Sequence, residues 1–176
     1  MKKLKSSKEL VMIFNATPII TLRELEYGNL IAEIRRACSV KIIIPQRVKE
    51  EFTEAGQELD IPSDDIEAEQ LASKHHIDVP LSIGKGERQA IEIAYALAQE
   101  AGMDAVIVVT DDKRARNKCE KLGISVIGTL GLIEYAKKHQ VIPKEKALAL
   151  LDKIPSTSLH ITPELLEKAR NQIKQQ

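Results

Sequence analysis

Aromatic residues are scarce in this chain of 176 residues, which contains three Tyr, two Phe and no Trp. Domains that recognise unpaired nucleic-acid bases commonly stack those bases on aromatic side chains. The composition therefore argues against base recognition by stacking as the main activity of the protein.

Cysteine is also rare: only Cys38 and Cys119 occur, and neither belongs to a Cys-x-x-Cys pair. This argues against a zinc site of the usual spacing and against the disulfide framework of a small secreted domain. We expect both residues to be buried free thiols. A bridge between them would fit only an intracellular protein of a hyperthermophile.

Long hydrophobic runs and an excess of one charge are absent as well. The apolar stretch at residues 11–14 is interrupted by Asn15 and Thr17, so neither a signal peptide nor a membrane span is predicted. We accordingly expect a cytoplasmic protein that does not contact membranes. Basic and acidic residues number 26 each, which disfavours a strongly electrostatic nucleic-acid binder.

What the sequence does have is the composition of one globular domain, with 43% hydrophobic and 30% charged residues. Short, nearly all-apolar runs rich in β-branched residues predict strands that are buried on both faces. These runs are residues 11–14, 40–44, 105–109 and 124–127.

Stretches with helical spacing lie between and after these runs. The predicted helices follow Pro45 and Gly86, run through residues 113–122, pass Leu132 and Ala136, and occupy about 144–152 and 162–174. Strands that alternate with helices indicate crossover connections, so we predict a three-layer αβα fold with a mainly parallel central sheet. Residues 9–139 would form this domain, and 140–176 a helical C-terminal extension packed on it.

Acidic and amide residues stand where the predicted strands end. Asn15 follows the first strand, and Asp111 and Asp112 follow the third. Glu87 begins a later helix, and Glu51 lies in the helix after the second strand. Side chains just past the carboxyl ends of parallel strands point into the crevice where ligands bind. Carboxylates gathered there repel one another unless a cation neutralises them, and an all-oxygen site suits Mg²⁺ or Mn²⁺.

Each of these positions also has a purely structural interpretation. Asp112 would cap the helix that follows it, Glu87 would interact favourably with a helix dipole, and Glu51 would be a solvated surface acid. Asn15 would be a turn residue ahead of a helix that begins near Pro18. The sequence by itself leaves these interpretations open.

Other catalytic motifs are missing from the sequence. The segment GKGER is not a dinucleotide fingerprint, because Gln89 stands where the third glycine would be. Neither a Walker-type phosphate loop nor a Gly-x-Ser-x-Gly elbow occurs. A small-molecule-binding α/β domain is a further alternative, and it predicts an apolar crevice. The histidines are interpreted as surface or structural residues: His75, His76, His139 and His160.

Together, several segments resemble the PIN-domain superfamily in order and spacing. They are IFNATPIITL, IIIPQRVKEEF, GKGERQAIEIAYAL and VIVVTDDKRARNKCEKLGISVIGTLGLI. The likeness covers roughly residues 9–139 and is most specific at 110–133. The tail SLHITPELLEKA resembles, more narrowly, a PIN-like family of prokaryotes that is common in archaea. The pattern is also similar to the toxin ribonucleases of virulence-associated toxin–antitoxin pairs.

The resemblance implies a ribonuclease that hydrolyses RNA phosphodiesters with the help of Mg²⁺ or Mn²⁺. The residues that it implies as catalytic are Glu51, Glu87, Asp111 and Asp112. The implied metal ligands are Asn15, Glu87 and Asp112. Thr17 and Thr110 match hydroxyl positions that support the site.

Partners are implied in the same way. RNA is the expected substrate, and Lys113, Arg114 and Arg116 would contact its backbone; otherwise these residues form a solvated helix face. An antitoxin protein is an expected partner if the chain is a toxin. The resemblance also implies a homodimer, to which the C-terminal helices would contribute.

Asn15 departs from the pattern, because nuclease-active PIN domains usually place Asp at this position. An amide oxygen can ligate a hard cation, but the amide removes one negative charge and is a poor base for orienting a water molecule. Two functions therefore stay open: an active ribonuclease, and a catalytically impaired PIN-like subunit that binds RNA or a protein.

Overall fold

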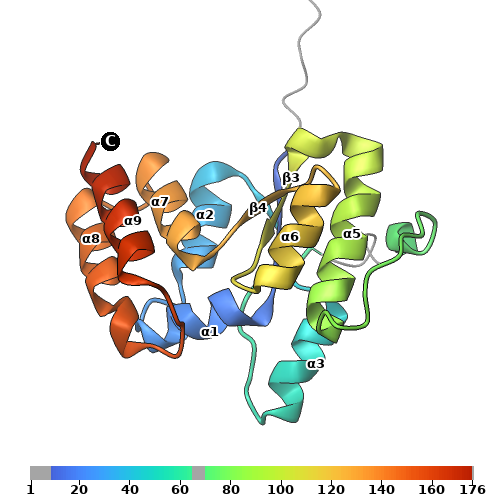
Figure 1. Cartoon of the computed structure of the whole chain (residues 1–176), viewed down its shortest axis with the longest axis horizontal. Coiled ribbons are helices and arrows are strands. Elements are labelled where there is room, and N and C mark those ends of the chain that lie inside the picture. Colours follow the sequence, from blue (N-terminus) through green and yellow to red (C-terminus); the bar gives the residue numbers. More distant parts are fainter. Residues whose placement is uncertain (1–8, 65–69, 176) are drawn as a thin grey trace, which may run out of the picture.

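A parallel sheet forms the centre of the protein (Figure 1). The computed structural model describes residues 9–64 and 70–175, and in these ranges the strands join in the order β2-β1-β3-β4, all parallel. The predicted αβα architecture with a parallel sheet is confirmed. The strands are β1 (Val11–Phe14), β2 (Lys41–Ile43), β3 (Val106–Val109) and β4 (Ser125–Ile127).

Three strands are shorter than the apolar runs that predicted them. Val40, Ile44 and Ile124 flank the strands and are at most 3% exposed, yet they stand outside the ladder pairs. Burial, rather than pairing, therefore explains why these flanking positions are apolar.

Helices cover both faces of the sheet (Figure 1). Most of them follow the prediction, but α2 was not predicted, although Leu30, Ile31 and Ile34 are buried on one of its faces. The bounds are α1 (Ala16–Glu24), α2 (Leu30–Cys38), α3 (Gln46–Glu54), α5 (Lys85–Ala101), α6 (Lys113–Lys121), α7 (Thr129–Lys138), α8 (Lys144–Lys153) and α9 (Pro163–Gln175), with short 3₁₀ turns at Met103–Ala105 and Ile154–Ser156.

Strand β1 divides its side chains between two hydrophobic clusters. Met12 and Phe14 pack with residues of α1, α2 and α7, and this cluster continues into α8 and α9. Val11 and Ile13 pack on the other face with residues of α5 and α6. Because both faces of the strand are buried, every position in it is apolar.

The parallel arrangement directs the carboxyl ends of all these strands to one edge of the sheet, which we name the carboxyl edge. Helices α1, α3, α6 and α7 each begin within four residues of a strand end, so their N-termini lie at this edge. The connection β3–α6–β4 joins neighbouring strands, as the short spacing in the sequence predicted. The carboxyl edge is therefore rich in helix N-termini.

Both cysteines are free; Cys119 is fully buried and Cys38 is half-buried. His75 pairs with Glu100 at 2.9 Å, and the ring of His139 packs against Tyr135. Within the described residues, no helix combines the length and the apolar character needed to cross a bilayer.

Replacing Phe14 by Ala should lower the free energy of unfolding by about 3–5 kcal/mol, because the fully buried ring would leave a cavity beside β1. The control is Ile20→Ala on α1, whose side chain is 38% exposed and whose loss should cost less than about 1 kcal/mol. Urea unfolding measures both variants. Equal losses would show that β1 does not lie at the centre of the core.

Candidate functional site at the carboxyl edge

Asn15 is a buried polar residue at the end of β1, with a side chain only 1% exposed. Its backbone N–H donates to the carbonyl of Val109 at 3.0 Å, which extends the pairing of β1 with β3. Its side-chain Oδ1 accepts from the backbone N–H of Ala16 at 2.7 Å and so caps α1. Because a backbone N–H can only donate, this bond decides which end of the amide is oxygen.

The nitrogen end of the same amide faces the centre of the site. Nδ2 of Asn15 donates to Oε1 of Glu87 at 2.9 Å and to Oγ1 of Thr110 at 3.1 Å. Thr110 is 1% exposed, and its Oγ1 also accepts from the backbone N–H of Asp112 at 3.2 Å. One hydrogen-bonded chain therefore links the ends of β1 and β3 to the first turn of α5.

Two glycines at the start of α5, noted in the sequence only as preceding a helix, leave room for the carboxylates of Glu51 and Glu87. A Cβ atom on Gly86 would lie 2.8 Å from Oε1 of Glu51 and 3.0 Å from Cγ2 of Val48, and a Cβ on Gly84 would collide with the carboxylate of Glu87. Gly86 also donates its backbone N–H to the Glu51 carboxylate. The spacing GKGE was the available signal, since close backbone approach is a common reason for glycine.

Glu51 and Glu87 influence each other electrostatically. Glu51 as a whole residue is exposed, but partial burial of its carboxyl group raises its pKa above the ordinary value, and the neighbouring negative charge of Glu87 raises the pKa further. The hydrogen bond from Gly86 acts in the opposite direction. The two acids thus form a pair whose repulsion is only partly offset.

Asp112 caps helix α6. Its Oδ1 accepts from the backbone N–H of Ala115 at 2.7 Å, which is the structural interpretation that the sequence left open for this residue. The backbone N–H of Asp112 also donates to Oγ1 of Thr110, which keeps the two residues side by side. Its carboxylate is thus engaged with the N-terminus of a helix at the carboxyl edge.

Asp111 binds a different helix. Its two carboxylate oxygens accept from the backbone N–H of Thr129 at 2.8 Å and from the Thr129 hydroxyl at 2.6 Å, so it holds the N-terminus of α7. Burial raises the pKa of Asp111, whereas the bonds from Thr129 and the charge of Arg116 lower it. Thr129 is fully buried and was not singled out from the sequence.

The predicted basic residues lie near this edge and differ in how far they are exposed to solvent. Lys113 and Arg114 are exposed in the first turn of α6, and Nη1 of Arg114 donates to the carbonyl of Ser82 at 2.8 Å. Arg116 is half-buried and faces Asp111. Thr17, predicted as a supporting residue, lies in the first turn of α1, where its carbonyl accepts from the Thr21 hydroxyl.

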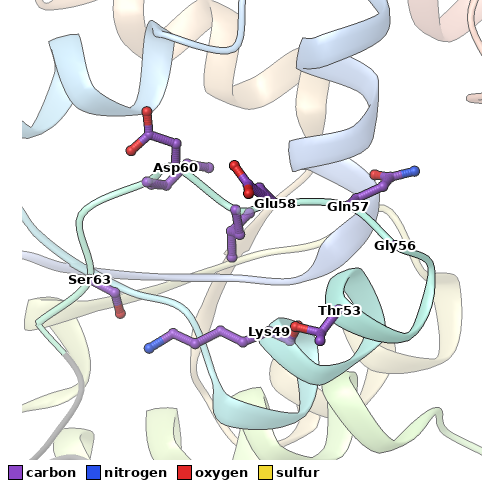
Figure 2. A pocket seen from close by; sticks show the side chains of 9 residues that line it. Lys49, Thr53, Gly56, Gln57, Glu58, Asp60 and Ser63 are labelled. Carbon is purple, nitrogen blue, oxygen red and sulfur yellow. The ribbon is translucent and has the colours of Figure 1, made fainter.

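A hollow of about 820 Å³ lies between α3 and residues 56–63 (Figure 2). None of its lining residues belongs to the set at the carboxyl edge. Most of its lining residues are polar or charged, and Leu59 and Ile61 add apolar side chains. The lining consists of Lys49, Thr53, Gly56, Gln57, Glu58, Leu59, Asp60, Ile61 and Ser63.

The side chains at the carboxyl edge do not fit a preformed cation site. Among residues 9–64 and 70–175, no group of three or more His, Cys, Asp or Glu side chains is close enough to hold a metal ion. The oxygen of Asn15 is engaged with Ala16, and its N–H₂ group points at Glu87, so a cation there would meet amide protons. The predicted ligand set stays a prediction, and Asn15 does not present a ligand oxygen in this arrangement.

The protein is therefore an α/β protein whose polar site lies at the carboxyl ends of its parallel strands. A family model described as a PIN domain matches residues 11–175, so the chain belongs to the PIN-domain family. PIN domains are generally metal-dependent nucleases. Neither a curated protein nor a solved structure matches the chain significantly.

Replacing Glu51 by Gln should stabilise the protein at neutral pH but not at acidic pH. Because the folded-state pKa of Glu51 is raised, the unfolded chain releases this proton first as the pH rises, and ionisation then costs stability. Below the unfolded pKa both states are protonated, and Gln imitates that neutral form. The difference in unfolding free energy, measured from about pH 4 to 7, should therefore grow with pH.

The control for this prediction is Glu164→Gln, which removes an exposed acid of α9 and should give no such gain. A Glu51→Gln difference that stays flat across the pH range, or that shrinks as the pH rises, would contradict the electrostatic account of the acid pair.

Proposed function

We propose that this PIN-domain protein binds RNA at the carboxyl edge of its sheet and is impaired in metal-dependent hydrolysis. The observation that carries the proposal is that each predicted acid already accepts a hydrogen bond from a donor of the protein. The pairs are Glu87 with Asn15, Glu51 with Gly86, Asp112 with Ala115, and Asp111 with Thr129.

Helix N-termini support the binding of a phosphate backbone at this edge. The helices α1, α3, α6 and α7 begin there, and α5 joins them through the contact of Glu87 with Asn15 (Figure 1). The dipole of each helix places a partial positive charge at its N-terminus, which offsets part of the negative charge of the acids that cap α6 and α7 there. The exposed side chains of Lys113 and Arg114 add two full positive charges beside these N-termini.

The same features support contacts to the RNA backbone instead of to its bases. The chain has few aromatic residues, so stacking contributes little, whereas Lys and Arg contacts to phosphate carry no sequence information. We therefore expect binding that falls steeply as the salt concentration rises and that depends little on RNA sequence.

The second candidate is a metal-dependent ribonuclease, and the pair of Glu51 and Glu87 favours it. Their repulsion raises the pKa of Glu51, and a cation would relieve that repulsion. Membership of the PIN-domain family supports the same activity. A toxin role with an antitoxin partner, and a homodimer, belong with this candidate as proposals.

Reversing the two exposed charges of α6 should weaken RNA binding. For Lys113→Glu with Arg114→Glu, we expect the Kd for a generic single-stranded RNA to rise by at least tenfold at low salt, since two phosphate contacts are lost and two repulsions are introduced. Fluorescence anisotropy measures this. The matched control is Lys137→Glu with Lys138→Glu, the same charge change in the last turn of α7, which begins at the carboxyl edge and runs away from it.

A cleavage assay with the same RNA separates the two candidates. In millimolar Mg²⁺ or Mn²⁺ we expect no cleavage above that of a Glu87→Gln variant. Cleavage by the wild-type protein that this substitution abolishes would establish the ribonuclease instead. Equal effects of the two charge reversals on binding would remove the carboxyl edge as the RNA site.

A further inference from the structure

Glu87 is a partly buried carboxylate that accepts a hydrogen bond from a neutral side-chain amide. Oε1 of Glu87 lies 2.9 Å from Nδ2 of Asn15. A buried carboxylate is costly unless it is paired or hydrogen-bonded. The amide of Asn15 meets this requirement for Oε1 by donating a hydrogen bond from its N–H₂ group.

The amide of Asn15 cannot reverse its orientation. Turning it over would point N–H₂ at the backbone N–H of Ala16, which now donates to Oδ1 at 2.7 Å, and would point oxygen at the Glu87 carboxylate. A donor would then face a donor at Ala16, and an acceptor would face an acceptor at Glu87, so both hydrogen bonds would be lost. The side chain is 1% exposed, so water cannot easily compensate. The atom that faces Glu87 is therefore always a donor.

We propose that Asn15 is a built-in substitute for a divalent cation: its fixed amide holds Glu87 in place in the metal-free protein, and a single change to Asp would convert the carboxyl edge into a site for Mg²⁺ or Mn²⁺. Asn15 is in this sense a positioning residue for Glu87. The inference concerns the same site as the proposed function and deepens it.

The reason lies in the near-identical shape of Asn and Asp. In Asn15→Asp one carboxylate oxygen keeps the cap on Ala16, and the other takes the position of Nδ2, about 3 Å from Oε1 of Glu87. Two carboxylate oxygens at this separation repel each other unless a proton or a cation lies between them. Without metal, the variant is therefore less stable than the wild type. Metal binding restores this stability, since a ligand that binds only the folded state stabilises that state.

Thermal unfolding of the full chain tests the inference without RNA and without an activity. In EDTA, the Tm of Asn15→Asp should lie roughly 5 °C below that of the wild type. Millimolar MnCl₂ should restore most of this loss, and it should move the wild-type Tm by less than about 1 °C. If the variant is unfolded in EDTA, the same inference expects folding on addition of MnCl₂, and failure to fold would overturn it.

Two further variants separate the inference from general effects of charge. Asn15→Asp with Glu87→Gln removes one of the two facing carboxylates, so its Tm should return toward the wild-type value and respond weakly to MnCl₂. Asn117→Asp makes the same chemical change at an exposed position of α6 and should not respond to the metal.

Several results would overturn the inference: equal Tm responses to MnCl₂ in the wild type and Asn15→Asp, an Asn15→Asp Tm in EDTA as high as that of the wild type, or a double variant that responds as strongly as the single one. Because these measurements contain no RNA, their failure is distinguishable from failure of the proposed RNA binding.

Discussion

The side chain of Asn15 is the contact on which the arrangement of the carboxyl edge depends. It caps α1 with its oxygen and reaches Glu87 and Thr110 with its nitrogen, so one buried amide connects β1, α1, α5 and the end of β3. Each of its hydrogen bonds determines the orientation of the others, because an amide has one acceptor end and one donor end. One buried residue therefore fixes how the ends of β1 and β3 meet α1 and α5.

Most of the acids around Asn15 have a structural role, because they accept hydrogen bonds from N–H groups at the starts of helices. Asp112 caps α6 and Asp111 caps α7, while Glu51 and Glu87 bind at the N-terminus of α5. A parallel sheet produces this pattern because helix N-termini gather at the edge where its strands end. Carboxylates are stabilised there by N–H donors and helix dipoles, so an acidic edge is compatible with a folded, metal-free protein. Family membership establishes the PIN architecture. What the carboxyl edge of this chain can bind depends on which polar atoms of these residues it presents.

The sequence predicted the sheet because burial on both faces makes β1 and β3 uninterrupted apolar runs, and it predicted which residues stand at the strand ends. It could not predict where their polar atoms point. The orientation of the Asn15 amide depends on the N–H of Ala16 and on Glu87, which is 72 residues away. Asp111 turns toward Thr129, 18 residues later, a pairing that depends on where β4 places the start of α7. Helix α2 has buried residues on one face that the sequence analysis did not use.

The side-chain amide of Asn15 can be observed directly by NMR in protein labelled with ¹⁵N-asparagine, since the other asparagines, Asn29, Asn117 and Asn171, are exposed. A donor held between Glu87 and Thr110 should exchange slowly with water, and its signals should stay in place when millimolar Mg²⁺ is added. Replacing Glu87 by Gln should shift them. Fast exchange, or a shift of the Asn15 signals that saturates with Mg²⁺ in the wild-type protein, would contradict the view that the amide occupies the role of the cation.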